Sequence, residues 1–415
     1  MKNLTATLCL TLTILVGSVG MSASADFQKG YTAAMSGDYA TALRELKPLA
    51  KQGNPDAQFV LGTIYATGKG VPQDYKTAVK WFKLAAEQGY DGAQYLLGDL
   101  YANGKGFPRN YKTAVKWFKL AAKQGLAPAQ HSLGNAYNNG QGVPKNHKTA
   151  VKWYRLAAKQ GLAGAQNNLG WMYKNGKGVS QNYKTAMKWY RLAAKQGHAT
   201  AQHSLGVMYK NGKGVPQDYK TAMKWYRLAA EQGYDLAQHS LGEMYIDGKG
   251  VPQNHKTAVK WYKLAAKQGN AESQYNLGTM YDKGKGVPQD HKTALKWYRL
   301  AAEQGDADAQ YNLGQMYRKG DGVPQDYKTA VKWYRLAAEQ GDASAQTNLG
   351  VMYGLGQGVI QDWVYAHMWG NVASSNGSVN GGKLRDLAAK KMTPSQLEKA
   401  QDLARECVRK KYKGC

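Results

Sequence analysis

Long apolar runs, phenylalanine, acidic residues and cysteine are all scarce in this chain of 415 residues. Beyond residue 25 no segment approaches the roughly 18 uninterrupted apolar residues of a membrane-spanning helix, so we expect no membrane span. There are 5 phenylalanines beside 29 tyrosines, and 28 acidic residues beside 56 lysines and arginines, which leaves a net charge of +28. Such lopsided usage is typical of a chain built by copying one short unit many times.

The first 25 residues have the organisation of a cleavable secretory signal peptide. Lys2 provides a positive charge, an apolar stretch follows over residues 8–19, and residues 23–25 read Ala-Ser-Ala, which resembles a cleavage site. Cys9 lies early in the apolar stretch and not at its end, which argues against a lipid-anchored cysteine. We therefore expect a mature chain that begins near Asp26 and is periplasmic or secreted.

The scarcity of cysteine leaves one candidate disulfide. An oxidising compartment favours the pairing of two lone cysteines, and Gly414 lets the tail fold back so that Cys407 and Cys415 come within reach of each other. The alternatives are free thiols, a bond to another chain, or a frayed tail in which neither sulfur has a role.

One 36-residue unit recurs nine times without an insertion and fills residues 57–380. The copies begin at Ala57, Ala93, Ala129, Ala165, Ala201, Ala237, Ser273, Ala309 and Ala345. A single hydrophobic core normally stops growing well before 415 residues, so a stack of repeats accounts for the length of the chain better than one large core.

The first half of each unit predicts a helix, named helix A below. In the sixth unit Ala237, Leu241, Met244 and Tyr245 recur at i, i+4, i+7 and i+8, which is the spacing of one apolar helix face. The glycine- and proline-rich segment 248–252 then ends the helix, because glycine permits left-handed backbone and proline lacks a donor.

The second half predicts helix B, from His255 to Lys267 in the same unit, with Asn254 placed to cap its start and Gly269 to end it. Two such helices cannot bury their apolar faces alone, so each pair must stack on the next. The predicted fold is all-α: a right-handed superhelical, tetratricopeptide-like solenoid of antiparallel helix pairs. Residues 26–56 form an N-terminal capping pair, and residues 381–415 form C-terminal capping helices.

The repeat pattern resembles a known family. It reads A-x-x-x-L-G-x-x-Y-x-x-G-x-G-V-x-x-[DN]-x-x-x-A-x-x-W-[YF]-x-x-A-A-x-x-G and is similar to the Sel-one-like repeat (SLR), a branch of the tetratricopeptide-like superfamily. The resemblance implies an adaptor that assembles other proteins, in bacteria often periplasmic or secreted. A cysteine-rich branch has been linked to binding or hydrolysing penicillin-like compounds, but no repeat of this chain contains cysteine.

Positions that vary among near-identical copies indicate where a partner binds. The third, seventh and tenth positions of the unit vary most and are spaced i, i+4 and i+7, so we expect them on one stripe of helix A, opposite its core face. The predicted groove residues are Tyr95, His131, Trp171, His203, His239, Tyr275 and Tyr311. They suit a peptide or partner helix. The alternative is neutral drift on an exposed face.

Helix B carries a second candidate surface, a basic ridge. Lys76, Lys80 and Lys83 lie at i, i+4 and i+7, and eight repeats copy this triplet, which gives 24 cations in register. One of these eight triplets consists of Lys220, Lys224 and Arg227. The ridge suits an anionic envelope glycan or lipid, or it is a solvated outer face that keeps a long solenoid in solution.

We expect no catalysis, metal or cofactor. The histidines are spread over different repeats, no nucleophile, base and orienting group recur together, and the G-K-G-V-P segment lacks the strand that precedes a phosphate-binding loop. Nucleic acid is not expected, because the lysines do not alternate with exposed aromatics. A weak hydrolase of cell-wall or β-lactam substrates remains as a second alternative to the scaffold and to the glycan or lipid binder.

Overall fold

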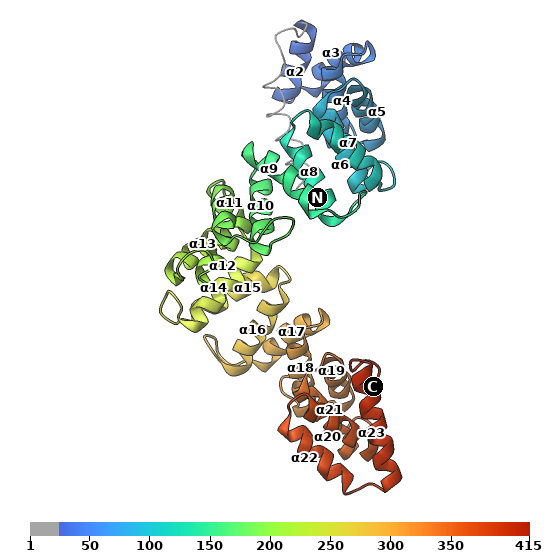
Figure 1. The fold of residues 1–415 in the computed structure, drawn as a ribbon, viewed down its shortest axis with the longest axis vertical. Coiled ribbons are helices and arrows are strands. Elements are labelled where there is room, and N and C mark those ends of the chain that lie inside the picture. The colour runs from blue at the N-terminus through green and yellow to red at the C-terminus, as the bar shows by residue number, and fades with distance from the viewer. Residues whose placement is uncertain (1–24) are drawn as a thin grey trace. The chain divides into compact units, whose positions relative to one another are not determined.

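The computed structural model describes residues 25–415, and every regular element in that range is a helix (Figure 1). The chain divides into two compact units. Unit 1 contains the residues up to Ala201 together with Lys213–Val215, and unit 2 contains Gln202–Gly212 and Pro216–Cys415. The predicted signal peptide lies outside the described residues, apart from Ala25, which is the first residue of the first helix.

The helices of unit 1 are α2 (Ala25–Ser36), α3 (Tyr39–Lys51), α4 (Pro55–Thr67), α5 (Tyr75–Glu87), α6 (Asp91–Asn103), α7 (Tyr111–Lys123), α8 (Ala127–Asn139), α9 (His147–Lys159), α10 (Ala163–Asn175) and α11 (Tyr183–Lys195). Helix α12 (Ala199–Lys210) contains the division between the units. Unit 2 continues with α13 (Tyr219–Glu231), α14 (Asp235–Asp247), α15 (His255–Lys267), α16 (Ala271–Lys283), α17 (His291–Glu303), α18 (Ala307–Lys319), α19 (Tyr327–Ala338), α20 (Ala343–Leu355), α21 (Trp363–Ser375), α22 (Val379–Ala389) and α23 (Pro394–Arg409).

These helices are the predicted pairs. Even-numbered helices from α4 to α20 are helix A of successive repeats, and odd-numbered helices from α5 to α21 are helix B. Each helix A begins two residues before the repeat start expected from the sequence, for example at Asp235 where the sequence predicts Ala237. The all-α, tetratricopeptide-like solenoid of helix pairs is confirmed.

Local sequence sets the helix ends as expected. The Asn254 side chain accepts a hydrogen bond from the backbone N–H of Thr257 at 2.8 Å, and α15 begins at the next residue, His255. Helix A of the same repeat ends at Gly248, whose φ of 67° places it in the left-handed region that glycine tolerates. The sequence therefore predicted the start of helix B to the residue.

The core of each repeat is built from apolar residues on helix A and one aromatic ring from helix B. In the sixth repeat Ala237, Leu241 and Met244 are at most 1% exposed. Tyr245, which the sequence assigned to the same face, is only half-buried, and its hydroxyl accepts a hydrogen bond from Arg227 at 3.3 Å. A Cβ atom placed on Gly242 would lie 2.4 Å from Cε1 of Tyr262, so glycine is what lets the two helices approach.

Two glutamines of a repeat bind backbone carbonyls of the preceding repeat. In unit 1 the Gln196 side-chain amide donates to Oε1 of Gln166 at 2.9 Å and to the carbonyl of Gly161 at 2.9 Å. Gln166 in turn donates to the carbonyl of Ala158 at 3.2 Å. Buried amides need partners, so this recurring pattern fixes how neighbouring repeats stack.

The C-terminal cap differs from the repeats. Helix α22 begins at Val379, two residues before the expected start of the C-terminal cap at residue 381, because Ser378 caps it by accepting from the backbone N–H of Gly381. Thr393 and Gln396 form a reciprocal capping box at the start of α23. A disulfide joins Cys407, which is 2% exposed, to Cys415. Among residues 25–415, no helix has the length and apolar character to cross a membrane.

Candidate interaction pocket

The predicted groove residues do not form a free stripe on helix A. Six of the seven occupy the third position of their repeats, and each of these rings packs on the helix B ring of the same repeat with centroids 5.4 to 6.0 Å apart. The pairs are Tyr95 with Phe118, His131 with Tyr154, His203 with Tyr226, His239 with Tyr262, Tyr275 with Tyr298, and Tyr311 with Tyr334. The third position therefore lies at the edge of the core.

The prediction of exposure is wrong for two of these residues. Tyr95 is 6% exposed and His239 is 8% exposed, because the helix B ring that lies against the nearby glycine also covers the third position. Trp171, at the seventh position, is 42% exposed, and the other four are half-buried. Contact between these seven residues and a partner stays a prediction.

Unit 2 holds a pocket between α12 and α14 that two of the predicted residues line. It has a volume of about 250 Å³, and its lining includes His203, Lys210, Leu236, His239 and Glu272. Leu236 is 42% exposed and the Glu272 side chain is 74% exposed, so the pocket opens to solvent. Residues of three successive helices A thus meet in one hollow, which we call the interaction pocket.

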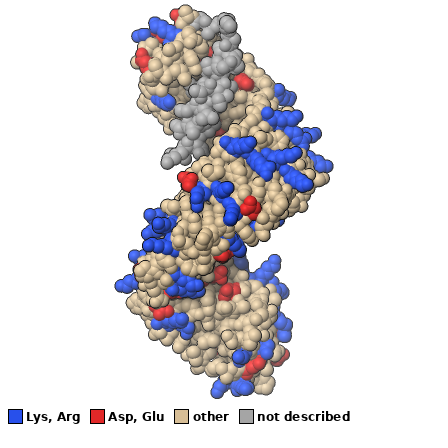
Figure 2. All heavy atoms as spheres, turned by 90° about the vertical axis from the view of Figure 1, so that its left-hand side faces the viewer, with Lys and Arg blue, Asp and Glu red and all other residues tan. Residues whose placement is uncertain are grey.

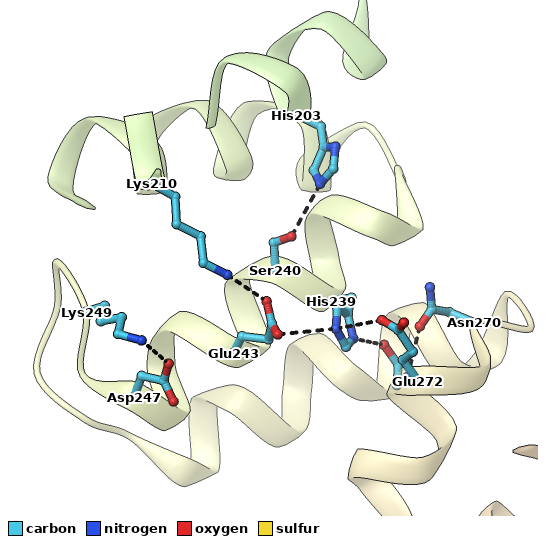
Figure 3. Close-up of polar contacts among 10 residues, drawn as sticks. His203, Lys210, His239, Ser240, Glu243, Asp247, Lys249, Asn270 and Glu272 are labelled. Atoms are coloured by element: carbon cyan, nitrogen blue, oxygen red, sulfur yellow. Dashed lines mark hydrogen bonds and ion pairs between the residues drawn. The ribbon is translucent and has the colours of Figure 1, made fainter. Parts of the chain in front are cut away.

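A network of hydrogen bonds and ion pairs orders the polar side chains of the interaction pocket (Figure 3). Nδ1 of His239 lies 2.9 Å from Oγ of Ser273, and its Nε2 lies 3.3 Å from a carboxylate oxygen of Glu272 and 3.8 Å from one of Glu243. The Lys210 ammonium donates to Glu243 at 3.0 Å. One buried imidazole therefore joins two carboxylates, and Glu243 is shared with Lys210.

The surroundings of Glu243 stabilise its ionised form. The hydrogen bond from His239 and the ion pair with Lys210 outweigh partial burial and lower the pKa of this carboxyl from 4.5 to about 2. Burial, aided by the Glu243 charge, raises the pKa of the nearby Tyr226 hydroxyl. The pocket therefore holds a permanent anion and a permanent cation side by side at neutral pH.

Replacing Glu243 by glutamine should reduce stability at neutral pH and leave it unchanged in strong acid. A carboxyl whose pKa is lowered on folding contributes stability above its ordinary pKa of 4.5, and this contribution is lost as pH falls toward 2. The Glu243 side chain is 40% exposed, so we expect about 1 kcal/mol after allowance for solvent screening. Urea unfolding of both proteins at a series of pH values measures the difference, with exposed Glu231→Gln as the background.

The network contains a serine, a histidine and a glutamate in hydrogen-bonding order, which the sequence did not reveal. A nucleophile needs access to its substrate, however, and Ser273 is 0% exposed beneath His239. The arrangement is thus suited to holding charged groups in fixed positions. It does not present a reactive hydroxyl to the pocket.

Sequence reasoning named His203 and His239 as groove residues. Glu243 and Lys210 lie at the seventh and tenth positions of the predicted stripe, although they were not named as groove residues. Ser240, Ser273 and Glu272 were missed. Oγ of Ser240 lies 3.3 Å from Nε2 of His203, so it belongs to the same pocket. One signal was present: Ser273 stands where the other eight repeats begin with alanine. A polar residue at a position otherwise reserved for a buried alanine indicates a local hydrogen-bond partner.

The equivalent position in unit 1 has a different chemistry. His131 lies 3.0 Å from the side-chain amide of Asn168, which also donates to Asn135 at 3.0 Å, and the Tyr154 hydroxyl donates to Asn135 at 2.8 Å. Its side-chain partner is thus an amide, and burial, with the nearby charge of His198, lowers its pKa to about 4. His131 is therefore a neutral part of an amide network.

The basic ridge is exposed as predicted. Lys76, Lys80 and Lys83 of α5, and Lys220, Lys224 and Arg227 of α13, all lie at the surface. In Figure 2 lysine and arginine side chains form several groups on the face shown, and acidic side chains are fewer there.

Comparison with known proteins identifies the repeat. The model of the Sel1 repeat matches residues 55–90, 92–126, 127–162, 163–198, 199–234, 235–270, 271–306, 307–342 and 343–378. A protective antigen present in uropathogenic Escherichia coli strains, which displays an SLR fold, is 36% identical, with a TM-score of 0.58 over 93% of this chain and 92% of that chain.

A Sel1 repeat protein from Oxalobacter formigenes is also 36% identical, with a TM-score of 0.53 over 59% of this chain and 96% of that chain. The curated proteins include no match.

Proposed function

Because this chain belongs to the Sel1 repeat family, whose members generally mediate protein–protein interaction, we propose that it is an exported scaffold that binds a protein partner in the interaction pocket of unit 2. The observation that carries the proposal is the convergence of Lys210, His239 and Glu272 on one solvent-open hollow. Scaffolds of this family are typically non-catalytic, and we propose no reaction here.

The chemistry of the interaction pocket suits a segment of polypeptide. Lys210 and Glu272 offer one charge of each sign, while Val207 and Leu236 add apolar surface beside them. A volume of about 250 Å³ accommodates a side chain or two of a partner, which is the size of an anchor in a protein interface. Because the network already fixes His239 and Glu243, little side-chain entropy is lost on binding.

Two observations support export. The N-terminal 25 residues have the pattern of a secretory signal peptide. The similar Escherichia coli protein is a protective antigen present in uropathogenic strains. On this basis we propose that the chain acts in the periplasm or outside the cell.

Site-specific photocrosslinking tests the proposed pocket. A photoreactive residue at Leu236, 42% exposed in the pocket, should give a defined crosslinked product in living cells. The same residue at Leu264, 46% exposed on helix B of the same region, is the matched control and should not give that product. The product should also disappear when Lys210 is changed to Glu. Crosslinking that is equal at both leucines and insensitive to Lys210→Glu would refute the pocket.

A further inference from the structure

Acidic residues are absent from a long internal segment of the chain. Between Asp99 and Asp218 there is no aspartate or glutamate, while the same segment contains 19 lysines and arginines. Most of this segment belongs to unit 1 and includes α7, α9 and α11, the helices B of the second, third and fourth repeats. The positive charge of the protein is therefore concentrated, and no acidic side chain of that segment compensates it.

On each of these three helices B, lysine and leucine share one exposed stripe. In α7 the stripe contains Lys112, Lys116, Leu120 and Lys123, at i, i+4, i+8 and i+11, which places them within an arc of about 80°. All four are exposed, and Leu120 is 45% exposed. An apolar side chain thus lies between the cations of the stripe, in contact with solvent.

The same stripe recurs on the next two helices B of unit 1, whereas on α5 it ends in Glu87. In α9 and α11 it consists of Lys148, Lys152, Leu156 and Lys159, and of Lys184, Lys188, Leu192 and Lys195. Equivalent glutamine bonds, from Gln160 to the carbonyl of Gly125 and from Gln196 to the carbonyl of Gly161, connect successive repeats, so the three helices are presented in the same way. We call these twelve side chains the basic amphipathic face.

Unit 2 offers a natural comparison. On α13 the stripe of Lys220, Lys224 and Leu228 ends in Glu231 instead of lysine. It borders a groove of about 480 Å³ whose lining also includes Gly250 and Val251 from the loop after α14. The aliphatic parts of the lysines and the exposed leucine therefore flank an apolar depression. The corresponding stripes on α7, α9 and α11 end in lysine instead of glutamate.

We propose that the basic amphipathic face of unit 1 binds an anionic lipid surface. Cations alone suit any polyanion, but a row of half-exposed leucines between them is costly in water and is covered when side chains insert below the level of lipid headgroups. Lysines beside such an apolar row contact the headgroup charges. This surface is independent of the interaction pocket, which lies in unit 2.

Vesicle co-sedimentation of the purified chain tests this. The protein should sediment with phosphatidylcholine vesicles that contain phosphatidylglycerol and should stay in solution with phosphatidylcholine alone. Lys123→Glu, Lys159→Glu and Lys195→Glu together should lower the partition coefficient by about tenfold or more. Glutamate is the native residue at this position in four other repeats, at 87, 231, 303 and 339, so the variant retains the fold.

A control variant makes the same change in net charge elsewhere. Lys319, Lys390 and Lys399 are exposed lysines of unit 2 outside the helices B, and their joint replacement by glutamate should have a much smaller effect. Equal loss in both triple variants would mean that only net charge matters and would overturn the proposal. Binding to neutral vesicles as strong as to anionic ones would overturn it as well.

A third variant separates lipid from soluble polyanion. Leu120→Gln, Leu156→Gln and Leu192→Gln together should lower vesicle binding by about tenfold and leave binding to dextran sulfate unchanged. If the leucine variant binds both ligands like the wild type, the surface recognises anionic polymer and the lipid proposal is wrong. Lys210→Glu should leave vesicle binding intact, so failure of the pocket proposal and failure of this one are distinguishable.

Discussion

Replacing Gly170 by alanine should destabilise the protein by about 3 kcal/mol, a large effect for the addition of one methyl group. Gly170 lies in the middle of α10, and a Cβ atom there would be 2.8 Å from Cδ1 of Tyr190 and 3.2 Å from the carbonyl oxygen of Ala186. Tyr190 is 1% exposed and cannot swing into solvent without leaving a cavity. The two helices of the repeat would have to move apart.

The same helix contains its own control. Gly164 also lies in α10, but a Cβ atom there would meet only Cε1 of His131, at the ordinary contact distance of 3.4 Å. Alanine has a higher helix propensity than glycine, so Gly164→Ala should be neutral or stabilise by up to about 1 kcal/mol. Urea denaturation followed by circular dichroism measures both variants, and opposite signs are expected.

Equal stability of the two variants would show that close approach at Gly170 does not limit the packing of helix A on helix B. Repeats contact mainly their neighbours, so the damage in Gly170→Ala should be local. Relative to the wild type, hydrogen exchange in Gly170→Ala should be faster in α10 and α11, which pack around the new methyl group. In α15 of unit 2 it should be unchanged.

Much of the fold is predictable from the sequence because the same capping residues and the same apolar spacing recur in nearly every repeat. The caps provide the clearest case: Asn254, one residue before His255, predicts the start of α15 to the residue. The start of helix A was expected two residues late, because Asp235 and Leu236 of the sixth repeat differ from their counterparts and were assigned to the end of the preceding unit. Where the first residues of a helix vary among the repeats, the repeat pattern alone does not locate the start of the helix.

The candidate site was less predictable, for a physical reason. Helix periodicity places the third position opposite the core of helix A, but it does not say how far a ring from helix B reaches across it. Because Gly242 lets Tyr262 lie flat against α14, the ring also covers His239. The partners of His239, Ser273 and Glu272, come from the next repeat, and such contacts depend on stacking geometry that no single repeat encodes.

Unit 1 should become less stable between pH 6.5 and 4, and His131 should make a large contribution to this change. Burial and the nearby charge of His198 lower the pKa of His131 in the folded protein from 6.5 to about 4. In this interval the unfolded chain binds a proton that the folded chain does not, so the free energy of unfolding falls as pH decreases. The loss is complete below pH 4 and amounts to about 3 kcal/mol.

His131→Tyr should remove this pH dependence while keeping the ring contact. Tyrosine is the native third-position residue at Tyr95, Tyr275 and Tyr311, where it packs on the helix B ring as His131 packs on Tyr154. The quantity that tests the prediction is the change in unfolding free energy between pH 7 and pH 4, whatever the difference between the two proteins at pH 7. This change should be smaller in the variant by about 3 kcal/mol.

A second substitution separates this effect from acid denaturation in general. His255→Tyr removes a histidine from unit 2 and restores the residue with which most helices B begin. Urea unfolding at several pH values should give a curve for His255→Tyr close to that of the wild type, and a flatter one for His131→Tyr. Parallel curves for all three proteins would contradict the neutral, buried state of His131, since a histidine that charges freely in the folded protein gives no linkage between folding and pH.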